Sequence, residues 1–253
     1  MMRALRAIVI LAALLAPDAV ARAAEIKVLV TTAMKAALDE LVPPFERSTG
    51  HKVVASYDPS GRLSQRLRKG EPADLILIAS SELDLLIKDR KVKDRTDVAR
   101  TGIGLAVKKG APHPDVSTPD ALKRTLLAAK TVGQTSLSGG GVTAFYIQRV
   151  FAQLGITDQV QPKLRFAAGG PDGRVSVLVS SGEAEIGLQL VSELMSNPDV
   201  EVIGTLPDKL QQFTVTAAGI TTSSKQPDAA RALIRHLISP EAKAVYKAKG
   251  LGL

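Results

Sequence analysis

The residues Asp58-Pro59-Ser60-Gly61 interrupt an apolar run, and Arg62 follows them directly. Pro, Gly and Asp favour turns, and apolar residues then recur at helical spacing, so we expect a helix to begin here. Ser60 would lie at the helix N-terminus, where free N–H groups and the macrodipole attract an anion, with Arg62 one turn inside. The segment therefore predicts half of an anion pocket. The alternative is that Ser60 acts only as an N-cap and Arg62 is a solvated surface charge.

Two glycine-rich turns precede further helical patterns in the second half of the chain. The sequence SLSGGG at 136–141 leads into an expected helix over 142–154, and GGPDG at 169–173 leads into one over 174–180. Backbone N–H groups of such turns can surround an anion. Hydroxyl side chains also follow two expected strands, at Thr31, Thr32 and Ser80.

Strands and helices must alternate to bring these groups together. We expect strands over 25–30, 51–56, 75–78, 102–108, 131–134, 163–167, 184–190 and 213–221, with helical patterns between most of them. This alternation predicts an α/β fold with helices on the faces of a parallel sheet. In such sheets ligands bind in the crevice at the carboxyl ends of the strands, where the groups named above lie.

A punctuated connection, Gly110 to Pro114, predicts a boundary between two α/β lobes. We expect residues 24–107 and 213–253 to form lobe 1 and residues 108–212 to form lobe 2. The ligand cleft would lie between them, with two crossing segments near Lys108 and Gln212 as the hinge.

The first 23 residues have the layout of a cleavable signal peptide. Arg3 and Arg6 precede the apolar run 7–16, and Ala21-Arg22-Ala23 offers a small-x-small cleavage site. The chain is 253 residues long, 45% hydrophobic and free of cysteine, so an exported protein of this sequence must fold without disulfides. We therefore expect a periplasmic protein.

The composition excludes several classes of site. A net charge of +8 permits anionic partners, but tryptophan is absent and no dense basic block occurs, so we expect no nucleic acid. Without cysteine and with three scattered histidines, a zinc site is not expected. Nucleotide-loop and hydrolase motifs are also absent, so we expect neither a metal nor a cofactor.

The mature chain resembles type II periplasmic substrate-binding proteins, above all the molybdate-binding proteins of ABC transporters. The most specific segment is Gly-Glu-Pro-Ala-Asp-Leu at 70–75, with further matches at 60–63, 143–146 and 182–187. The resemblance implies the two-lobed type II fold and a monomer that closes round a small anionic ligand. It also implies delivery of that ligand to an ABC transporter membrane permease.

The family's ligand contacts carry over in part. Ser60 matches a serine contact, but Ala33 stands where the family has a serine, and Leu190, beside Gln189, stands where a tyrosine is usual. Arg62 and Arg174 occupy helix starts where small residues are usual, and guanidinium groups suit carboxylates. The ligand is then a molybdate-type oxyanion or, favoured by these residues, an organic di- or tricarboxylate such as aconitate. The expected ligand-binding residues are Thr31, Thr32, Ser60, Gly61, Arg62, Ser80, Gly141, Val142, Thr143, Asp172, Gly173, Arg174 and Gln189.

The chain also resembles aconitate isomerases, exported enzymes of the same fold. Isomerisation requires proton transfer beside a carboxylate-bearing carbon, and hence a base in the cleft. Asp58, His51 and Asp172 are the candidates by position, although each also has a structural interpretation. An isomerase is therefore the alternative to a transport protein.

Overall fold

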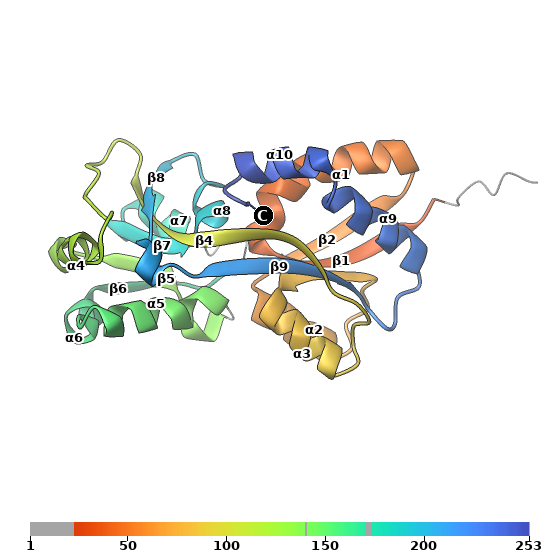
Figure 1. Cartoon of the computed structure of the whole chain (residues 1–253), viewed down its shortest axis with the longest axis horizontal. Coiled ribbons are helices and arrows are strands. Elements are labelled where there is room, and N and C mark those ends of the chain that lie inside the picture. The colour runs from red at the N-terminus through yellow and green to blue at the C-terminus, as the bar shows by residue number, and fades with distance from the viewer. Residues whose placement is uncertain (1–22, 140, 171–173, 253) are drawn as a thin grey trace, which may run out of the picture.

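The computed structural model describes residues 23–139, 141–170 and 174–252, which form two α/β lobes side by side (Figure 1). The strands follow the order β2 (Lys52–Asp58), β1 (Glu25–Thr31), β3 (Leu75–Ala79), β9 (Phe213–Ile220), β4 (Thr96–Lys108), β7 (Ile186–Leu190), β5 (Val132–Thr135) and β6 (Leu164–Ala167), with β8 (Val200–Thr205) also paired to β4. The two-lobed α/β class expected from the sequence is confirmed. The signal peptide prediction concerns residues outside this range. No helix in the described part of the chain is long and apolar enough to cross a membrane.

Lobe 1 is built on the first part of this sheet. Strands β1 (Glu25–Thr31), β2 (Lys52–Asp58) and β3 (Leu75–Ala79) are parallel to one another. Strand β9 (Phe213–Ile220) runs antiparallel to β3 and to the first half of β4 (Thr96–Lys108). Strand β3 is buried throughout, as its unbroken apolar sequence predicts.

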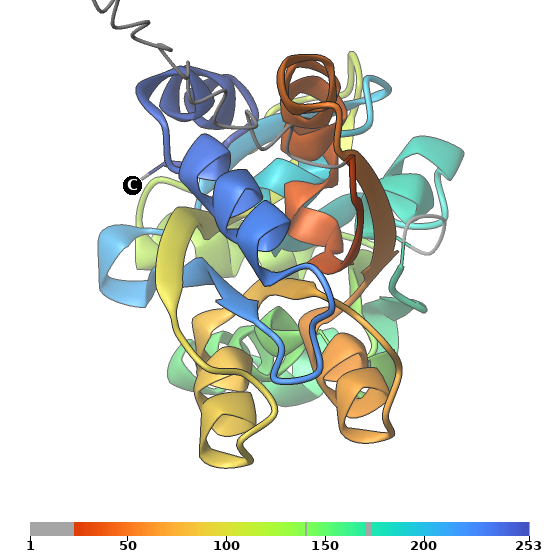
Figure 2. The ribbon, with the colours of Figure 1, turned by 90° about the vertical axis from the view of Figure 1, so that its right-hand side faces the viewer.

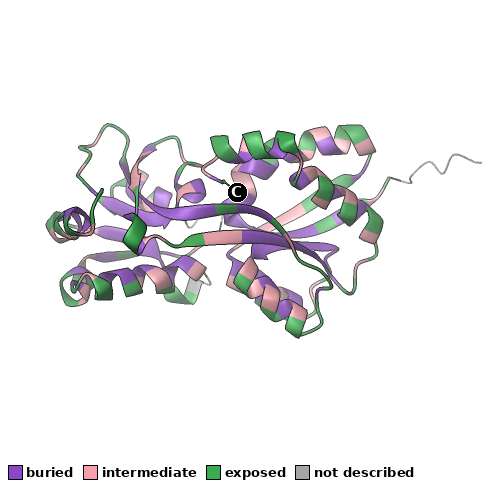
Figure 3. Cartoon of the chain, viewed as in Figure 1, coloured by how far each residue is buried: buried purple, intermediate pink, exposed green. Residues whose placement is uncertain are grey.

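Helices cover both faces of the lobe 1 sheet (Figures 1 and 2). One face carries α1 (Lys35–Thr49), α9 (Pro227–Leu237) and α10 (Pro240–Ala248), and the other carries α2 (Ser60–Arg68) and α3 (Ser80–Lys88). Phe45, Leu233 and Tyr246 join Ile26 in one buried cluster, so the C-terminal helices pack on lobe 1. Of the strands between the helices, β3 is buried throughout and β1 over most of its length, whereas β2 at the sheet edge is half-buried (Figure 3).

Lobe 2 contains the second half of β4 with β7 (Ile186–Leu190), β5 (Val132–Thr135), β6 (Leu164–Ala167) and β8 (Val200–Thr205). Its helices are α4 (Pro119–Ala128), α5 (Val142–Gln153), α6 (Thr157–Val160), α7 (Val175–Ser181) and α8 (Val191–Leu194). Gly187 lets α7 lie close to β7, because a Cβ there would come within 2.7 Å of the Val175 side chain.

Strands β4 and β9 run side by side from one lobe towards the other (Figure 1). Between Gly102 and Ile103, β4 exchanges its partner β9 for β7. The side-chain amide of Gln211 fills the gap: its Nε2 donates to the Ile103 carbonyl and its Oε1 accepts from the Ile103 N–H, both at 2.9 Å. A side chain thus completes the hydrogen bonding where the backbone ladder changes partner.

Two strands differ from the sequence-based expectation. Strand β4 begins at Thr96 rather than at residue 102, because its first half is stabilised by pairing with the distant β9. Strand β8 was not expected, since it has only six residues and depends on β4 for its hydrogen bonds. The division into lobe 1 (residues 24–107 and 213–253) and lobe 2 (residues 108–212) stays a prediction. Strand β4 crosses the proposed boundary between residues 107 and 108.

Candidate functional site

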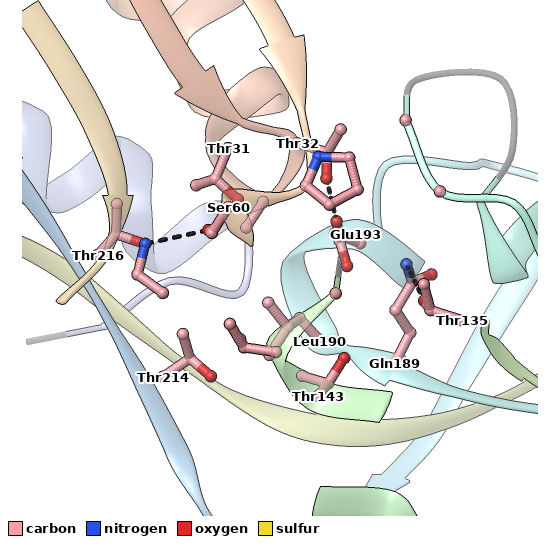
Figure 4. Close-up of a pocket in the computed structure, with 17 residues that line it drawn as sticks. Thr31, Thr32, Ser60, Thr135, Thr143, Gln189, Leu190, Glu193, Thr214 and Thr216 are labelled. Atoms are coloured by element: carbon pink, nitrogen blue, oxygen red, sulfur yellow. Dashed lines mark hydrogen bonds between the residues drawn. The ribbon is translucent and has the colours of Figure 1, made fainter. Parts of the chain in front are cut away.

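A small pocket with a cavity volume of about 30 Å³ lies where the two lobes meet (Figure 4). Lobe 1 lines it with polar residues from strand ends and from β9, which include Thr31, Thr32, Ser60, Thr214 and Thr216. Lobe 2 lines it with Thr135, Gly141, Val142, Thr143, Gln189, Leu190 and Glu193, and with the Gly169-Gly170 turn. Among the lining residues that the structure describes, there is no lysine or arginine.

The topology explains why these residues meet. Strands β1, β3, β5 and β7 all end at the pocket, so the segments that follow them gather at one edge. Two helices of at least nine residues, α2 and α5, begin at the pocket with Ser60 and Val142. The N–H groups of a first helical turn have no partner within the helix and favour negative charge. The pocket therefore offers anion-binding groups from both lobes.

Ser60 is buried and holds β3 against α2. Its Oγ accepts a hydrogen bond from the backbone N–H of Ala79 at 3.0 Å. A hydroxyl that accepts in this way keeps its own hydrogen for donation. Because Ser60 lines the pocket, that hydrogen is available to a bound anion.

Gln189 is oriented by its surroundings. Its Oε1 accepts from the backbone N–H of Val175 at 3.1 Å, so its Nε2 must face the other way, where Thr135 Oγ1 lies at 3.5 Å. Both side chains are buried and line the pocket. Lobe 2 thus presents a fixed amide donor beside a hydroxyl group.

Glu193, on α8, brings a carboxyl group into the pocket. The hydroxyl of Thr32 donates to its Oε1. Burial raises the pKa of this carboxyl, against the opposing effects of the Thr32 hydrogen bond, the Arg174 charge and Gln189. A protonated carboxyl is a donor, so Glu193 in that form can face an anion.

The two expected arginines lie around the pocket but are not among its lining residues. Arg62, on α2 of lobe 1, reaches across to lobe 2, where its Nη2 donates to the carbonyl of Ala168. Its Nη1 lies 3.4 Å from Asp58 Oδ1. Arg174 donates through Nη1 to Ser196 Oγ, and its charge acts on Glu193.

The pocket includes some of the expected ligand-binding residues and omits others. Those that line it are Thr31, Thr32, Ser60, Gly141, Val142, Thr143 and Gln189. Ser80 lines an adjacent cavity, and Gly61, Arg62 and Arg174 line neither. Asp172 and Gly173 lie outside the described residues.

Among the lining residues with polar side chains, sequence analysis missed four: Thr135, Glu193, Thr214 and Thr216. A signal existed for Glu193, which comes three residues after the end of β7 and so lies at the same strand edge as Gln189. Thr214 and Thr216 belong to the antiparallel strand β9, which the rule about carboxyl ends of parallel strands does not cover.

Two of the three residues suggested as the base of an isomerase are described by the structure, and both lie away from the pocket. Asp58 pairs with Arg62 and Arg66 and does not line the pocket. His51 precedes β2 at the end of the strand away from the pocket, where its Nδ1 accepts from the Ala24 N–H at 3.2 Å. No group of side chains that could hold a metal ion occurs in the described ranges.

Comparisons with known proteins bear on the family and the fold of the chain. A family model described as bacterial extracellular solute-binding protein matches residues 26–252. Aconitate isomerase from Pseudomonas sp. is 34% identical over 220 residues, which cover 84% of this chain and 81% of that protein. The molybdate-binding protein ModA of Azotobacter vinelandii is 29% identical over 244 residues, 92% of each chain. The solved structure of the Azotobacter vinelandii periplasmic molybdate-binding protein has a TM-score of 0.76 at 21% identity, and covers 90% of this chain and 99% of that one.

Proposed function

Since the chain belongs to the family of bacterial extracellular solute-binding proteins, we propose that it captures a small carboxylate-bearing organic anion in the pocket between its lobes. It acts in the periplasm as a monomer and delivers the ligand to the membrane permease of an ABC transporter. Lobe closure round the ligand is the motion that this function requires.

The observation that carries the proposal is the convergence of neutral donors from both lobes. An anion removed from water needs hydrogen-bond donors on most of its oxygens. Ser60, Gln189 and the first turns of α2 and α5 supply them at one point. Neutral donors bind a charge without a permanent ion pair, which suits a ligand that must later be released.

The lining favours an organic acid over a molybdate-type oxyanion. Ala33 and Leu190 line the pocket with apolar groups on two sides, whereas a tetrahedral oxyanion needs donors all round. The Glu193 carboxyl also suits a carboxylate partner, because two carboxyl groups can share one proton in a strong hydrogen bond. The 34% identity to a protein named aconitate isomerase gives independent support.

Thermal unfolding in the presence of candidate anions tests this function. We expect citrate, cis-aconitate or trans-aconitate to raise the midpoint, since a ligand at 100 times its dissociation constant stabilises by about 2.7 kcal/mol. Molybdate, tungstate and sulfate should have smaller effects at the same concentration. Stabilisation by molybdate or tungstate, with no response to any organic acid, would overturn the assignment.

A second candidate function, isomerisation of aconitate, is favoured by the position of Glu193. Its carboxyl faces the pocket, so in its ionised form it can accept a proton from a carbon next to a ligand carboxylate. Incubation with cis-aconitate followed by chromatography distinguishes this function from transport. An isomerase converts cis- to trans-aconitate and loses the activity in Glu193→Gln, whereas a transport protein returns the ligand unchanged.

A further inference from the structure

A larger cavity adjoins the anion pocket. Its volume is about 210 Å³, against about 30 Å³ for the pocket itself. The two share four lining residues: Ala79 and Thr214 from lobe 1, and Val142 and Thr143 from lobe 2. These four residues form the common border of the two spaces, here called the neck, to which both lobes contribute.

The neck lies away from the Thr32–Glu193 contact. Thr143 and Thr214 are on the opposite side of the pocket from Thr32 and Glu193 (Figure 4). A ligand whose first carboxylate lies beside Glu193 and whose chain runs towards Thr143 and Thr214 approaches the larger cavity.

The larger cavity has a polar lining without charge. Ser80, Ser81 and Thr143 contribute hydroxyl groups, and Gln212 contributes an amide. Tyr146 also lines it, with its hydroxyl donating to the Leu210 carbonyl at 2.8 Å. None of the described lining residues is acidic, so an anionic group that enters meets hydroxyl and amide donors and no like charge.

We infer that this cavity is a second subsite, which takes the distal carboxylate arm of an extended organic acid while the proximal carboxylate occupies the anion pocket. The inference rests on the proposed function and narrows the ligand to acids with at least two carboxylates separated by a carbon chain. A compact inorganic oxyanion fills only the anion pocket and gains nothing from Ser80 or Ser81. The length of the organic acid, as well as its charge, then decides which ligand binds.

Filling the second cavity without touching the first tests this inference. Ser80 lines only the larger cavity, so Ser80→Phe should block it and Ser80→Ala should only remove a hydroxyl. Calorimetry with citrate and cis-aconitate as long probes and malonate as a short one gives the readout. We expect a loss of at least tenfold in affinity for the long acids in Ser80→Phe, and less than threefold in Ser80→Ala. Malonate should change less than twofold in both.

Two controls keep the outcomes distinct. The unfolding midpoint of each variant shows that it is folded, and Ser81→Phe blocks the same cavity from the next residue. Unchanged affinity for the long acids in both Phe variants, or an equal loss for malonate, would overturn the second subsite alone. A wild-type protein that binds no organic acid would overturn the proposed function and this inference with it.

Discussion

Thr32 and Glu193, 161 residues apart in the sequence, form a buried hydrogen bond that joins lobe 1 to lobe 2 inside the pocket. Thr32 begins the short helical turn after β1, and Glu193 lies on α8 after β7. The bond exists only when the lobes are together, so it links the state of the ligand site to the relative position of the lobes.

Replacement of Thr32 by valine should destabilise this arrangement. Valine keeps the shape but lacks the hydroxyl, which leaves the Glu193 carboxyl without its donor, at a cost of about 1–3 kcal/mol. Thr32→Ser keeps the donor and serves as the matched control. Urea unfolding measures the difference, and equal stability of the two variants would show that the bond contributes nothing.

Glu193 should make stability depend on pH. Burial raises its pKa in the native state above the unfolded value of about 4.3. At pH values between these two pKa values, the native state therefore binds more protons than the unfolded state. Stability should therefore fall as the pH rises from about 4.3 through the raised pKa, by up to about 1.4 kcal/mol per pH unit.

Glu193→Gln removes the titrating group, so its stability should lack that decline over the same pH range. Glu183→Gln, at an exposed turn, is the control and should follow the wild type. A constant difference in unfolding free energy between wild type and Glu193→Gln at every pH would contradict the prediction.

Ser60→Ala should weaken ligand binding by about tenfold, because it removes one donor hydrogen bond worth about 1 kcal/mol or somewhat more. It also removes the acceptor of the Ala79 N–H, so some loss of stability is expected. Ser64→Ala on the same helix is the matched control. Ser64 is equally buried and accepts from Arg68 at 2.8 Å, but does not line the pocket. The two variants should differ in calorimetric affinity and resemble each other in stability.

Arg62→Ala tests the proposal that this guanidinium group contributes to ligand binding. Arg62 lines neither cavity, so we expect the loss to act through its charge-assisted contact with Ala168 on lobe 2 and to reduce carboxylate affinity about ten- to a hundredfold. Lysine should recover part of the loss, because it lacks the planar fork. Arg68→Ala, which removes the pair with Asp89 and the bond to Ser64, both away from the pocket, is the control. Unchanged affinity in Arg62→Ala would identify a surface charge.

Much of the fold could be predicted from the sequence, because apolar runs such as 75–78 and glycine-rich turns act locally. The resemblance to periplasmic binding proteins of the molybdate-binding type is confirmed by the comparisons. The first half of β4 and all of β8 could not be predicted, since each owes its hydrogen bonds to a strand distant in the sequence.

The site was less predictable than the fold. Thr31, Thr32 and Ser60 could be located because each lies at or just after the end of a recognisable strand of a parallel pair. Glu193 was missed although it follows β7 closely, because glutamate is rarely buried and its helix α8 has only four residues. Arg62 was expected at the cleft on the basis of its place near the start of α2. Its contact with Ala168 depends on the position of lobe 2, and a local sequence pattern carries no information about that position.

The amide of Gln211, which holds both backbone groups of Ile103 where β4 changes partner, also bears on the speed of ligand exchange. If the proposed opening of the lobes bends β4 and β9 at this point, it strains or breaks these two bonds. Gln211 does not touch the pocket. The time that a ligand stays bound can therefore be altered at the crossing strands, through the rate of opening, while every group that contacts the ligand remains the same.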